Sequence, residues 1–350
     1  MPLETIAMQS DKTLHICRLD KFIPPFIDLV KENFSFSKHD FLLFGNLQAF
    51  PTKLDKNVIY FHHAYQIFAL ILKMNQSKKI ILHSLFNPLV VFLLFMQPWL
   101  LKKCYWIMWG GDLYYYKFRN HTFKTNLYEN IRRVVIKRIG HFVTYFEEEY
   151  QLAQEWYAAY GVHHACFSYP SNIFNNIELD QVAHDSINIQ IGNSATPSNQ
   201  HMAVLEKLAP YKDLNIKIYI PLSYGDIEYA QQVIDFGRNI FGDKLVAVQQ
   251  FMPLDSYKKF LSIIDIAIFN NNRQQAVGNI ISLLGFGKKV FMRSDVSSWK
   301  SLNNMGLKIF DIDNLGISKL DPDDSKHNKN IVSTCFSKAN LITQLENIFI

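Results

Sequence analysis

Short apolar runs alternate with longer amphipathic stretches along the whole chain. The runs in the first half are rich in β-branched and aromatic residues, which predicts strands. These strands are expected at Thr13–Cys17, Phe41–Gly45, Val58–Phe61, Lys79–His83, Tyr105–Trp109, His141–Tyr145 and Ala165–Tyr169. The stretches between them predict helices at Ala64–Lys73, Pro88–Lys102, Asn126–Arg138 and Glu147–Tyr160. This order is typical of a parallel sheet covered by helices.

The second half repeats the rhythm. Its predicted strands are Ile187–Gly192, Ile216–Pro221, Leu245–Gln249, Ile264–Asn270 and Lys289–Met292, and its predicted helices are Asn199–Leu208, Ile227–Phe241, Leu254–Ile263, Val277–Phe286 and Ser297–Asn304. Residues 318–329 are expected to form an exposed excursion before a last helix near Asn340–Phe349. The pattern therefore predicts an α/β protein of two doubly wound, Rossmann-like domains, residues 1–170 and 171–350, with the polar segment Tyr169–Asn176 as the linker.

Composition and charge agree with two globular domains and suggest different partners for each. With 350 residues, 49% of them apolar, the chain has material for two cores. Residues 1–175 contain 19 Lys and Arg against 13 Asp and Glu, a net of +6, and the remainder has 17 against 18, a net of −1. The basic residues accompany no nucleic-acid-binding motif. We therefore expect the first half to meet anionic lipid or a pyrophosphate-linked acceptor, and we expect no nucleic acid partner.

Other features indicate a cytoplasmic protein. The four cysteines are far apart and form no C-x-x-C pair, which argues against disulfides and a zinc site. Residues 1–10 lack the pattern of a secretory signal. The apolar segment Leu85–Leu101 has too few apolar residues between its two prolines to span a bilayer. A buried helix is expected there, and the alternative is an interfacial helix with Trp99 and the following lysine pair at its edge.

Polar residues after three strands of the second half predict a site for a phosphate-bearing ligand, because ligands of open α/β sheets bind at the carboxyl ends of the strands. Gly192, Asn193 and Ser194 open a helix and could cradle a diphosphate, although an ordinary helix cap explains the same residues equally well. At the next corner, Ser223 and Tyr224 could contact a base or sugar, and the alternative is a plain turn with a helix cap. The strongest signal is the segment with Arg273, Gln274, Gln275 and Gly278, in which Arg273 offers a fixed fork for phosphate. The alternative is a solvated loop.

The first half offers candidates for the acceptor and for catalysis. Asp112 follows a strand and two glycines, so it would suit a general base for an acceptor hydroxyl. The alternative is an Asp that caps the next helix. His83 is a second catalytic candidate. The residues expected to bind the acceptor are Asn87, Trp109, Gly110, Gly111 and Tyr114.

Several motifs are missing from the expected positions. No G-x-G-x-x-G follows the first strand, and neither a P-loop nor a G-x-S-x-G elbow occurs. These absences weigh against a dinucleotide oxidoreductase, a P-loop kinase and a serine hydrolase. No D-x-D motif connects two of the predicted strands, so we expect no metal and no other cofactor, with Arg273 and helix N–H groups stabilising the leaving diphosphate.

The sequence resembles glycosyltransferase family 56, the TDP-N-acetylfucosamine:lipid II N-acetylfucosaminyltransferases. The resemblance runs from about Lys79 to Phe310 and is carried by five segments: Phe86-Asn-Pro88, Trp109-Gly-Gly-Asp-Leu-Tyr114, Ile191-Gly-Asn-Ser194, Pro221-Leu-Ser-Tyr224, and Arg273-Gln-Gln275 with Gly278. Gly111 departs from the family pattern, which has alanine there.

This resemblance implies a GT-B fold with a cleft between its domains, the donor held by the second domain and the acceptor by the first. It also implies transfer of 4-acetamido-4,6-dideoxygalactose or a related sugar from a dTDP-sugar to an undecaprenyl-diphosphate-linked glycan. The reaction would serve enterobacterial common antigen or O-antigen synthesis, with the protein peripheral on the cytoplasmic face of the inner membrane. The alternatives are a GT-B-like nucleotide-sugar epimerase and a non-catalytic sugar-nucleotide-binding protein.

Overall fold

The computed structural model describes residues 10–175, 184–250 and 252–350, and it divides into two compact units. Unit 1 runs to Ser171 and also includes Leu341–Ile350, and unit 2 is Asn172–Asn340. The boundary lies one residue from the predicted one. The second domain predicted as 171–350 is nevertheless wrong at its end, because the last ten residues belong to unit 1. The segment 1–9, where no signal was expected, and Asn176, at the end of the predicted linker, lie outside the described residues.

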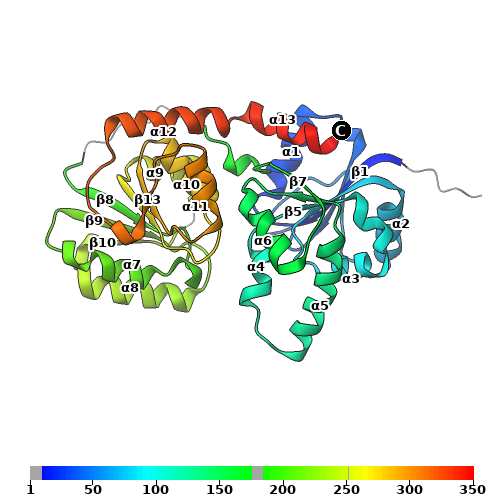
Figure 1. Cartoon of the computed structure of the whole chain (residues 1–350), viewed down its shortest axis with the longest axis horizontal. Helices are drawn as coiled ribbons and strands as arrows, with labels where there is room; N and C mark the ends of the chain where they lie inside the picture. Colours follow the sequence, from blue (N-terminus) through cyan, green and yellow to red (C-terminus); the bar gives the residue numbers. More distant parts are fainter. Residues whose placement is uncertain (1–9, 176–183, 251) are drawn as a thin grey trace, which may run out of the picture. The chain divides into compact units, whose positions relative to one another are not determined.

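Unit 1 contains a seven-stranded parallel sheet in the order β3-β2-β1-β4-β5-β6-β7 (Figure 1). Its strands are β1 (Ser10–Arg18), β2 (His39–Phe44), β3 (Val58–Tyr60), β4 (Ser77–His83), β5 (Cys104–Ile107), β6 (His141–Val143) and β7 (Val162–His164). Its helices are α1 (Ile23–Asn33), α2 (Gln66–Gln76), α3 (Pro88–Met96), α4 (Gly111–Phe118), α5 (Phe123–Arg138) and α6 (Glu147–Tyr157), joined by the end of α13 (Lys338–Phe349). A short 3-10 helix, η2 (Pro98–Lys103), follows α3.

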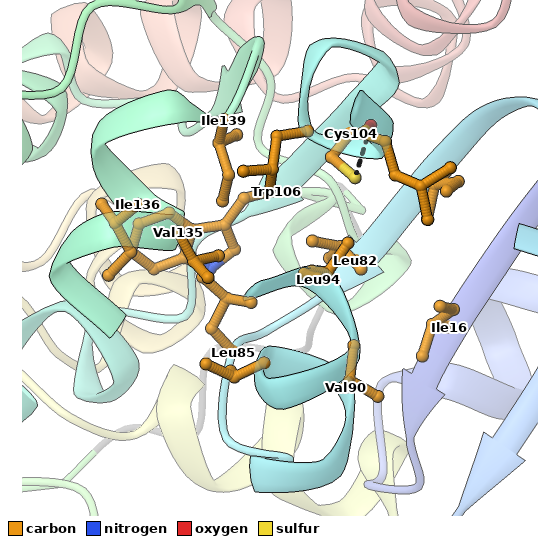
Figure 2. Close-up of a cluster of buried hydrophobic side chains, with 14 of the residues drawn as sticks. Ile16, Leu82, Leu85, Val90, Leu94, Cys104, Trp106, Val135, Ile136 and Ile139 are labelled. Carbon is orange, nitrogen blue, oxygen red and sulfur yellow. Dashed lines mark hydrogen bonds between the residues drawn. The ribbon is translucent and has the colours of Figure 1, made fainter. Parts of the chain in front are cut away.

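Alternate residues of each strand serve two separate cores, because successive strand side chains point to opposite faces. Leu14 and Ile16 of β1 belong to one apolar cluster that also takes side chains from α2, α3, α5 and α6. Figure 2 shows this cluster around Trp106, with Val135 and Ile136 of α5 facing the strands. These four helices therefore cover one face of the sheet.

The opposite face is covered by α1 and the end of α13. His15 of β1 points to this side, where its ring stacks on Phe41 and lies near Phe26 of α1. Phe349 of α13 packs edge-on against His39 and His15. The C-terminal residues thus complete the core of unit 1, which explains why they belong to it.

Unit 2 contains a six-stranded parallel sheet in the order β10-β9-β8-β11-β12-β13. Its strands are β8 (Ile187–Ile191), β9 (Ile216–Pro221), β10 (Leu245–Val248), β11 (Ile266–Phe269), β12 (Lys289–Met292) and β13 (Phe310–Asp311). Its helices are α7 (His201–Leu208), α8 (Ile227–Phe241), α9 (Leu254–Ser262), α10 (Val277–Gly285), α11 (Ser297–Asn304) and α12 (Pro322–Cys335).

The structure confirms most of the predicted elements and corrects a few. The last strand predicted in the first half lies three residues too late, since β7 ends at His164. The expected excursion at residues 318–329 is mostly the start of α12, whose N-cap is Asp321 followed by a proline, the residues that favour a helix start. Helices α1 and α4 and strand β13 were not predicted.

Both sheets have the doubly wound order in which the chain reverses direction beside its first strand. In unit 2 the reversal lies between β8 and β11, and in unit 1 between β1 and β4. At such a point the loops on the two strands turn to opposite sides, which leaves room for a ligand at the carboxyl edge. The candidate sites are therefore the loops after β8 and β11 in unit 2, and after β1 and β4 in unit 1.

Candidate functional sites

A hydrogen-bonded network joins the loops after β8, β9 and β11 of unit 2. Asn193 Nδ2 donates to Tyr224 Oη at 2.9 Å, and Gln275 Nε2 donates to Asn193 Oδ1 at 3.1 Å. Ser198 Oγ completes the network by donating to Gln275 Oε1 at 2.7 Å. Residues up to 82 positions apart in sequence thus meet at the reversal point of the sheet. The structure brings together the three segments from which the donor site was predicted.

The β8 loop is shaped by tight packing around Gly192. This residue has φ +62°, and a Cβ atom there would lie 2.6 Å from His201 Nε2 and 2.8 Å from Asn199 Oδ1. A side chain is therefore excluded both by backbone conformation and by contact. Asn199 Oδ1 also accepts from the backbone N–H of Asn193, and Asn199 Nδ2 reaches the carbonyl of Ser194. Ser194 is buried and serves the loop itself.

The β11 loop places Arg273 beside the network. Its Nη1 donates to the carbonyl of Gln274 at 3.1 Å, and both side chains are half-buried. The loop ends at Ala276, whose φ of +62° is uncommon for alanine, and α10 begins at the next residue. Strain of this kind concentrates at functional loops. Gly278 lies in the first turn of α10, where it accepts a bond from Ser282, and Ser223 is half-buried at the corner after β9.

A second polar group at the same edge was missed by the sequence reasoning. Gln200 Oε1 accepts from Asn270 Nδ2 at 3.2 Å and from Arg293 Nη1 at 3.4 Å. Arg293 follows β12 directly and forms a two-point ion pair with Asp295 that raises the pKa of the guanidinium. Its place just after a strand is the signal that could have revealed it. Unit 2 therefore presents two arginines at its carboxyl edge, Arg273 and Arg293.

In unit 1, Asp112 is a buried structural anchor. Its Oδ2 accepts from Leu85 N at 2.9 Å and from Trp106 Nε1 at 2.7 Å, while Oδ1 accepts from Trp109 N at 2.9 Å and from Leu113 N at 3.1 Å. The residue is fully buried, and burial raises the pKa of its carboxyl against the opposing effect of these hydrogen bonds. This geometry gives no support to contact with an acceptor hydroxyl. The capping alternative is also wrong, because Asp112 lies inside the first turn of α4 and the N-cap is Gly110, without a side-chain cap. The carboxylate instead fixes the loops after β4 and β5 through Leu85 N and Trp109 N.

A buried arginine strengthens this anchor. Arg132 of α5 donates to the carbonyls of Leu85 and Asp112, and its Nε lies 3.2 Å from Glu129 Oε2. Arg132 and Asp112 therefore tie the loops after β4 and β5 to α5. As a result, the loops after β4 and β5 are held in one conformation by buried hydrogen bonds.

His83 is also interior, and it belongs to a chain of hydrogen bonds. Its Nδ1 lies 2.8 Å from Tyr169 Oη and its Nε2 lies 3.1 Å from His15 Nδ1, while His15 Nε2 lies 2.9 Å from His39 Nδ1. We call His15, His39 and His83 the histidine chain. Burial lowers the pKa of His83 to about 3 and that of His39 to about 4, and it holds the pKa of His15 well below its usual value. All three are neutral near pH 7, and His83 reaches no surface from which it could act on a substrate.

The surface of unit 1 at the reversal point is aromatic and basic. The guanidinium of Arg18, after β1, lies 5.3 Å from the ring centroid of Phe86, after β4. Trp109 stands edge-on to Phe86 and to Phe22 and donates from Nε1 to Tyr169 Oη at 2.7 Å. Trp109 is the predicted acceptor residue that this geometry favours most. Arg18 and Phe22 were missed, and the signal for Arg18 was its position at the end of the first strand.

The remaining residues that were predicted to bind the acceptor have structural roles. Asn87 caps α3 by accepting from Leu89 N, and Gly110 has φ +73° at the start of α4. Gly111 lies against Phe86, since a Cβ there would be 3.2 Å from the ring. Tyr114 is buried, with its hydroxyl 3.4 Å from Glu149. Burial contradicts direct acceptor contact by Tyr114 in this conformation.

One D-x-D sequence does lie at the end of a strand, because Asp311 is the last residue of β13 and Asp313 lies in the turn that follows. Asp311 accepts from the backbone N–H of Asp313, and Asp313 pairs with Lys207 at 2.9 Å. The two carboxylates thus cap a helical turn and form a surface ion pair. Within the described ranges, no three His, Cys, Asp or Glu side chains are grouped as metal ligands would be.

The fold is shared with solved glycosyltransferases. A glycosyltransferase from Rickettsia africae has a TM-score of 0.65 and 14% identity and covers 97% of each chain. WaaG, a glycosyltransferase involved in lipopolysaccharide biosynthesis, has a TM-score of 0.57 and 8% identity, covering 96% of this chain and 94% of WaaG. Anabaena HepE, solved in complex with UDP, has a TM-score of 0.65 and 10% identity, covering 96% and 98%. The fold is that of a two-domain α/β glycosyltransferase of the GT-B type.

The particular family follows from the sequence. The family model described as 4-alpha-L-fucosyltransferase, glycosyl transferase group 56, matches residues 29–327. The chain belongs to this family, as the resemblance predicted, and it is a glycosyltransferase. In the described part of the chain no helix has both the length and the apolar character needed to cross a bilayer.

Proposed function

We propose that the protein transfers a deoxy-amino sugar, 4-acetamido-4,6-dideoxygalactose or a close relative, from a dTDP carrier to an undecaprenyl-diphosphate-linked glycan. The product would enter enterobacterial common antigen or O-antigen synthesis at the cytoplasmic face of the inner membrane. The observation that carries the proposal is the network of Asn193, Gln275, Ser198 and Tyr224, which occupies the reversal point of unit 2 with Arg273 beside it. Membership of a fucosyltransferase family and the basic first half support it further.

The network suggests a division of roles in donor binding. Arg273 and the N–H groups at the start of α10 would hold the diphosphate, since guanidinium and helix N-termini both favour phosphate oxygens. Tyr224, which is 43% exposed, offers a ring face to the base or sugar. Asn193 and Gln275 orient each other and Tyr224. When the sugar leaves, charge develops on the diphosphate, and a fixed arginine stabilises that charge without the aid of a metal ion.

Acceptor binding is assigned to the aromatic and basic surface at the reversal point of unit 1, formed by Arg18, Phe86 and Trp109, which we call the acceptor rim. Trp109 and Phe86 give apolar faces that suit a sugar ring, and Arg18 gives a positive charge for an acceptor diphosphate. Asp112 fixes the backbone of this surface by accepting hydrogen bonds from Leu85 N and Trp109 N.

Release of dTDP tests the function. The protein is incubated with dTDP-sugars and a lipid-linked acceptor, and dTDP and glycosylated lipid are measured together. The proposal expects both products, and only when donor and acceptor are present. Conversion of the donor without acceptor would instead indicate an epimerase, and binding without any turnover would indicate a non-catalytic sugar-nucleotide-binding protein.

Titration calorimetry with dTDP tests the phosphate role separately. Arg273→Ala should weaken binding by about 10- to 100-fold, because a charge-assisted hydrogen bond contributes about 1.5–3 kcal/mol. Arg238→Ala, in the last turn of α8, is a matched arginine control outside the network. Unchanged dTDP affinity in Arg273→Ala would contradict the assignment.

A further inference from the structure

The charge of unit 1 is concentrated in one long segment. Between Lys56 and Phe146 the sequence has 13 Lys and Arg residues and only two carboxylates, Asp112 and Glu129. Both carboxylates are buried, at 0% and 1% exposure. This segment includes α2, α3, α4 and α5. It therefore contributes basic side chains, and no carboxylate, to the surface of the protein.

Large apolar side chains are exposed in the same segment. Phe92 and Phe95 share one face of α3, because residues three apart are neighbours on a helix. Trp99 is also exposed, in η2, just after α3 ends at Met96. At the α4–α5 turn, Phe123 is 83% exposed and Leu127, one turn later, is 53% exposed. We call these five residues, with Lys117 and Lys124 at the turn, the outer surface of unit 1.

The parts of the outer surface lie on one side of the sheet. Helices α2, α3 and α5 bury their inner sides in a single apolar cluster, so their outer sides face away from the same face of the sheet (Figure 1). The end of α2 is joined to η2, since Trp99 Nε1 donates to Asn75 Oδ1 at 3.0 Å and Asn75 Nδ2 donates to Gln97 Oε1 at 2.7 Å. Trp99 is thereby held in a fixed, exposed position. Such a group of apolar side chains, rimmed by charge, is characteristic of an interaction site.

We propose that the outer surface of unit 1 docks on an anionic lipid bilayer. Aromatic side chains settle at the interface between headgroups and hydrocarbon, and lysines beside them are attracted to anionic headgroups. A second copy of the chain is a poorer occupant, because two such surfaces would bring positive charges together without a carboxylate on either side. The docking places the acceptor rim of unit 1 beside the lipid that carries the acceptor, and in this respect it rests on the proposed function.

Vesicle co-sedimentation of the full chain tests the docking. Vesicles of phosphatidylcholine with phosphatidylglycerol are compared with vesicles of phosphatidylcholine alone. Binding should require phosphatidylglycerol and should weaken as salt is raised. The double variant Phe123→Ser/Leu127→Ser should lower the partition coefficient by about tenfold or more, since two exposed apolar groups no longer enter the interface. Lys117→Glu/Lys124→Glu should lower it by a similar factor of about ten or more.

Leu214→Ser is the matched control. Leu214 lies in unit 2 and is 50% exposed, close to the 53% of Leu127. Its substitution should leave vesicle binding unchanged. Thermal unfolding of each variant shows whether a loss of binding reflects a loss of folding, and the charge variant gives an independent measurement if the serine variant is unstable.

The outcomes separate this inference from the proposed function. Equal binding to both kinds of vesicle, or full binding by both double variants, would overturn the docking surface. So would vesicle-independent self-association that the same variants abolish, because a second copy would then be the occupant. Transfer to a detergent-solubilised acceptor by a protein that binds no vesicles would leave the function standing and the docking refuted. Vesicle binding without any transfer would support the docking and refute the proposed function.

Discussion

Replacing Asp112 by asparagine distinguishes a structural anchor from a catalytic base. The two side chains have the same shape, but one oxygen becomes an NH₂ group. Whichever oxygen is replaced, two of the four donors around it lose their acceptor: either Leu85 N and Trp106 Nε1, or Trp109 N and Leu113 N. Each buried donor left unpaired costs about 1–3 kcal/mol. Asp112→Asn should therefore lower the free energy of unfolding of unit 1 by about 2–5 kcal/mol.

Denaturant unfolding followed by tryptophan fluorescence measures this loss. Four of the five tryptophans lie in unit 1, so the signal reports mainly on that unit. Asp28→Asn on α1 removes an exposed carboxylate and should change the unfolding free energy by less than about 0.5 kcal/mol. An Asp112→Asn protein with unchanged stability and a turnover lowered by orders of magnitude would refute the structural role and restore the catalytic one.

Three further predictions concern backbone, hydrogen bonds and pH. Gly192→Ala should destabilise unit 2 by about 1–3 kcal/mol in denaturant unfolding, because the residue combines positive φ with two side-chain contacts, whereas Gly316→Ala, with nothing nearby, should have little effect. Tyr169→Phe removes the acceptor of Trp109 Nε1 and should cost about 1–2 kcal/mol and shift the tryptophan emission spectrum; an unchanged spectrum would contradict the contact. Folding lowers the pKa of the histidine chain, so below about pH 6.5 the unfolded state binds protons that the folded state does not. The unfolding free energy of unit 1 should thus fall between about pH 6.5 and pH 4, by about 1.4 kcal/mol per pH unit for each histidine, and replacing the exposed His121 by glutamine should not alter that slope.

The pattern of apolar runs was enough to predict the two sheets, because parallel strands buried on both faces read as continuous apolar segments. Helix α1 escaped notice because its first turn contains two adjacent prolines, which resemble a loop in sequence although they are tolerated at a helix start. Strand β13 has two residues, too few to show any periodicity. The place of the last ten residues in unit 1 depends on tertiary packing that no local pattern encodes.

The candidate sites were predicted unevenly for a physical reason. The sequence predicts which residues follow the end of a strand. In unit 2 this was enough to predict the site, since Asn193, Tyr224 and Gln275 are hydrogen-bonded to one another. Whether a side chain then points outward or inward depends on its partners. His83 ends β4 and Asp112 follows β5 in the first turn of α4, but the hydrogen-bond partners of both lie in the interior. In the sequence, a polar residue that is buried among hydrogen-bond donors looks the same as a polar residue that binds a ligand.

The return of residues 341–350 to unit 1 has a practical consequence for anyone who wishes to study the units apart. A polypeptide stopped after Ser171 would lack Phe349, which shields His39, and would leave Lys79 without the carbonyl of Ile348. Such a fragment would expose an apolar seam and tend to aggregate. Joining the terminal segment back to Ser171 through a short flexible tether, with unit 2 omitted, should yield a folded unit 1.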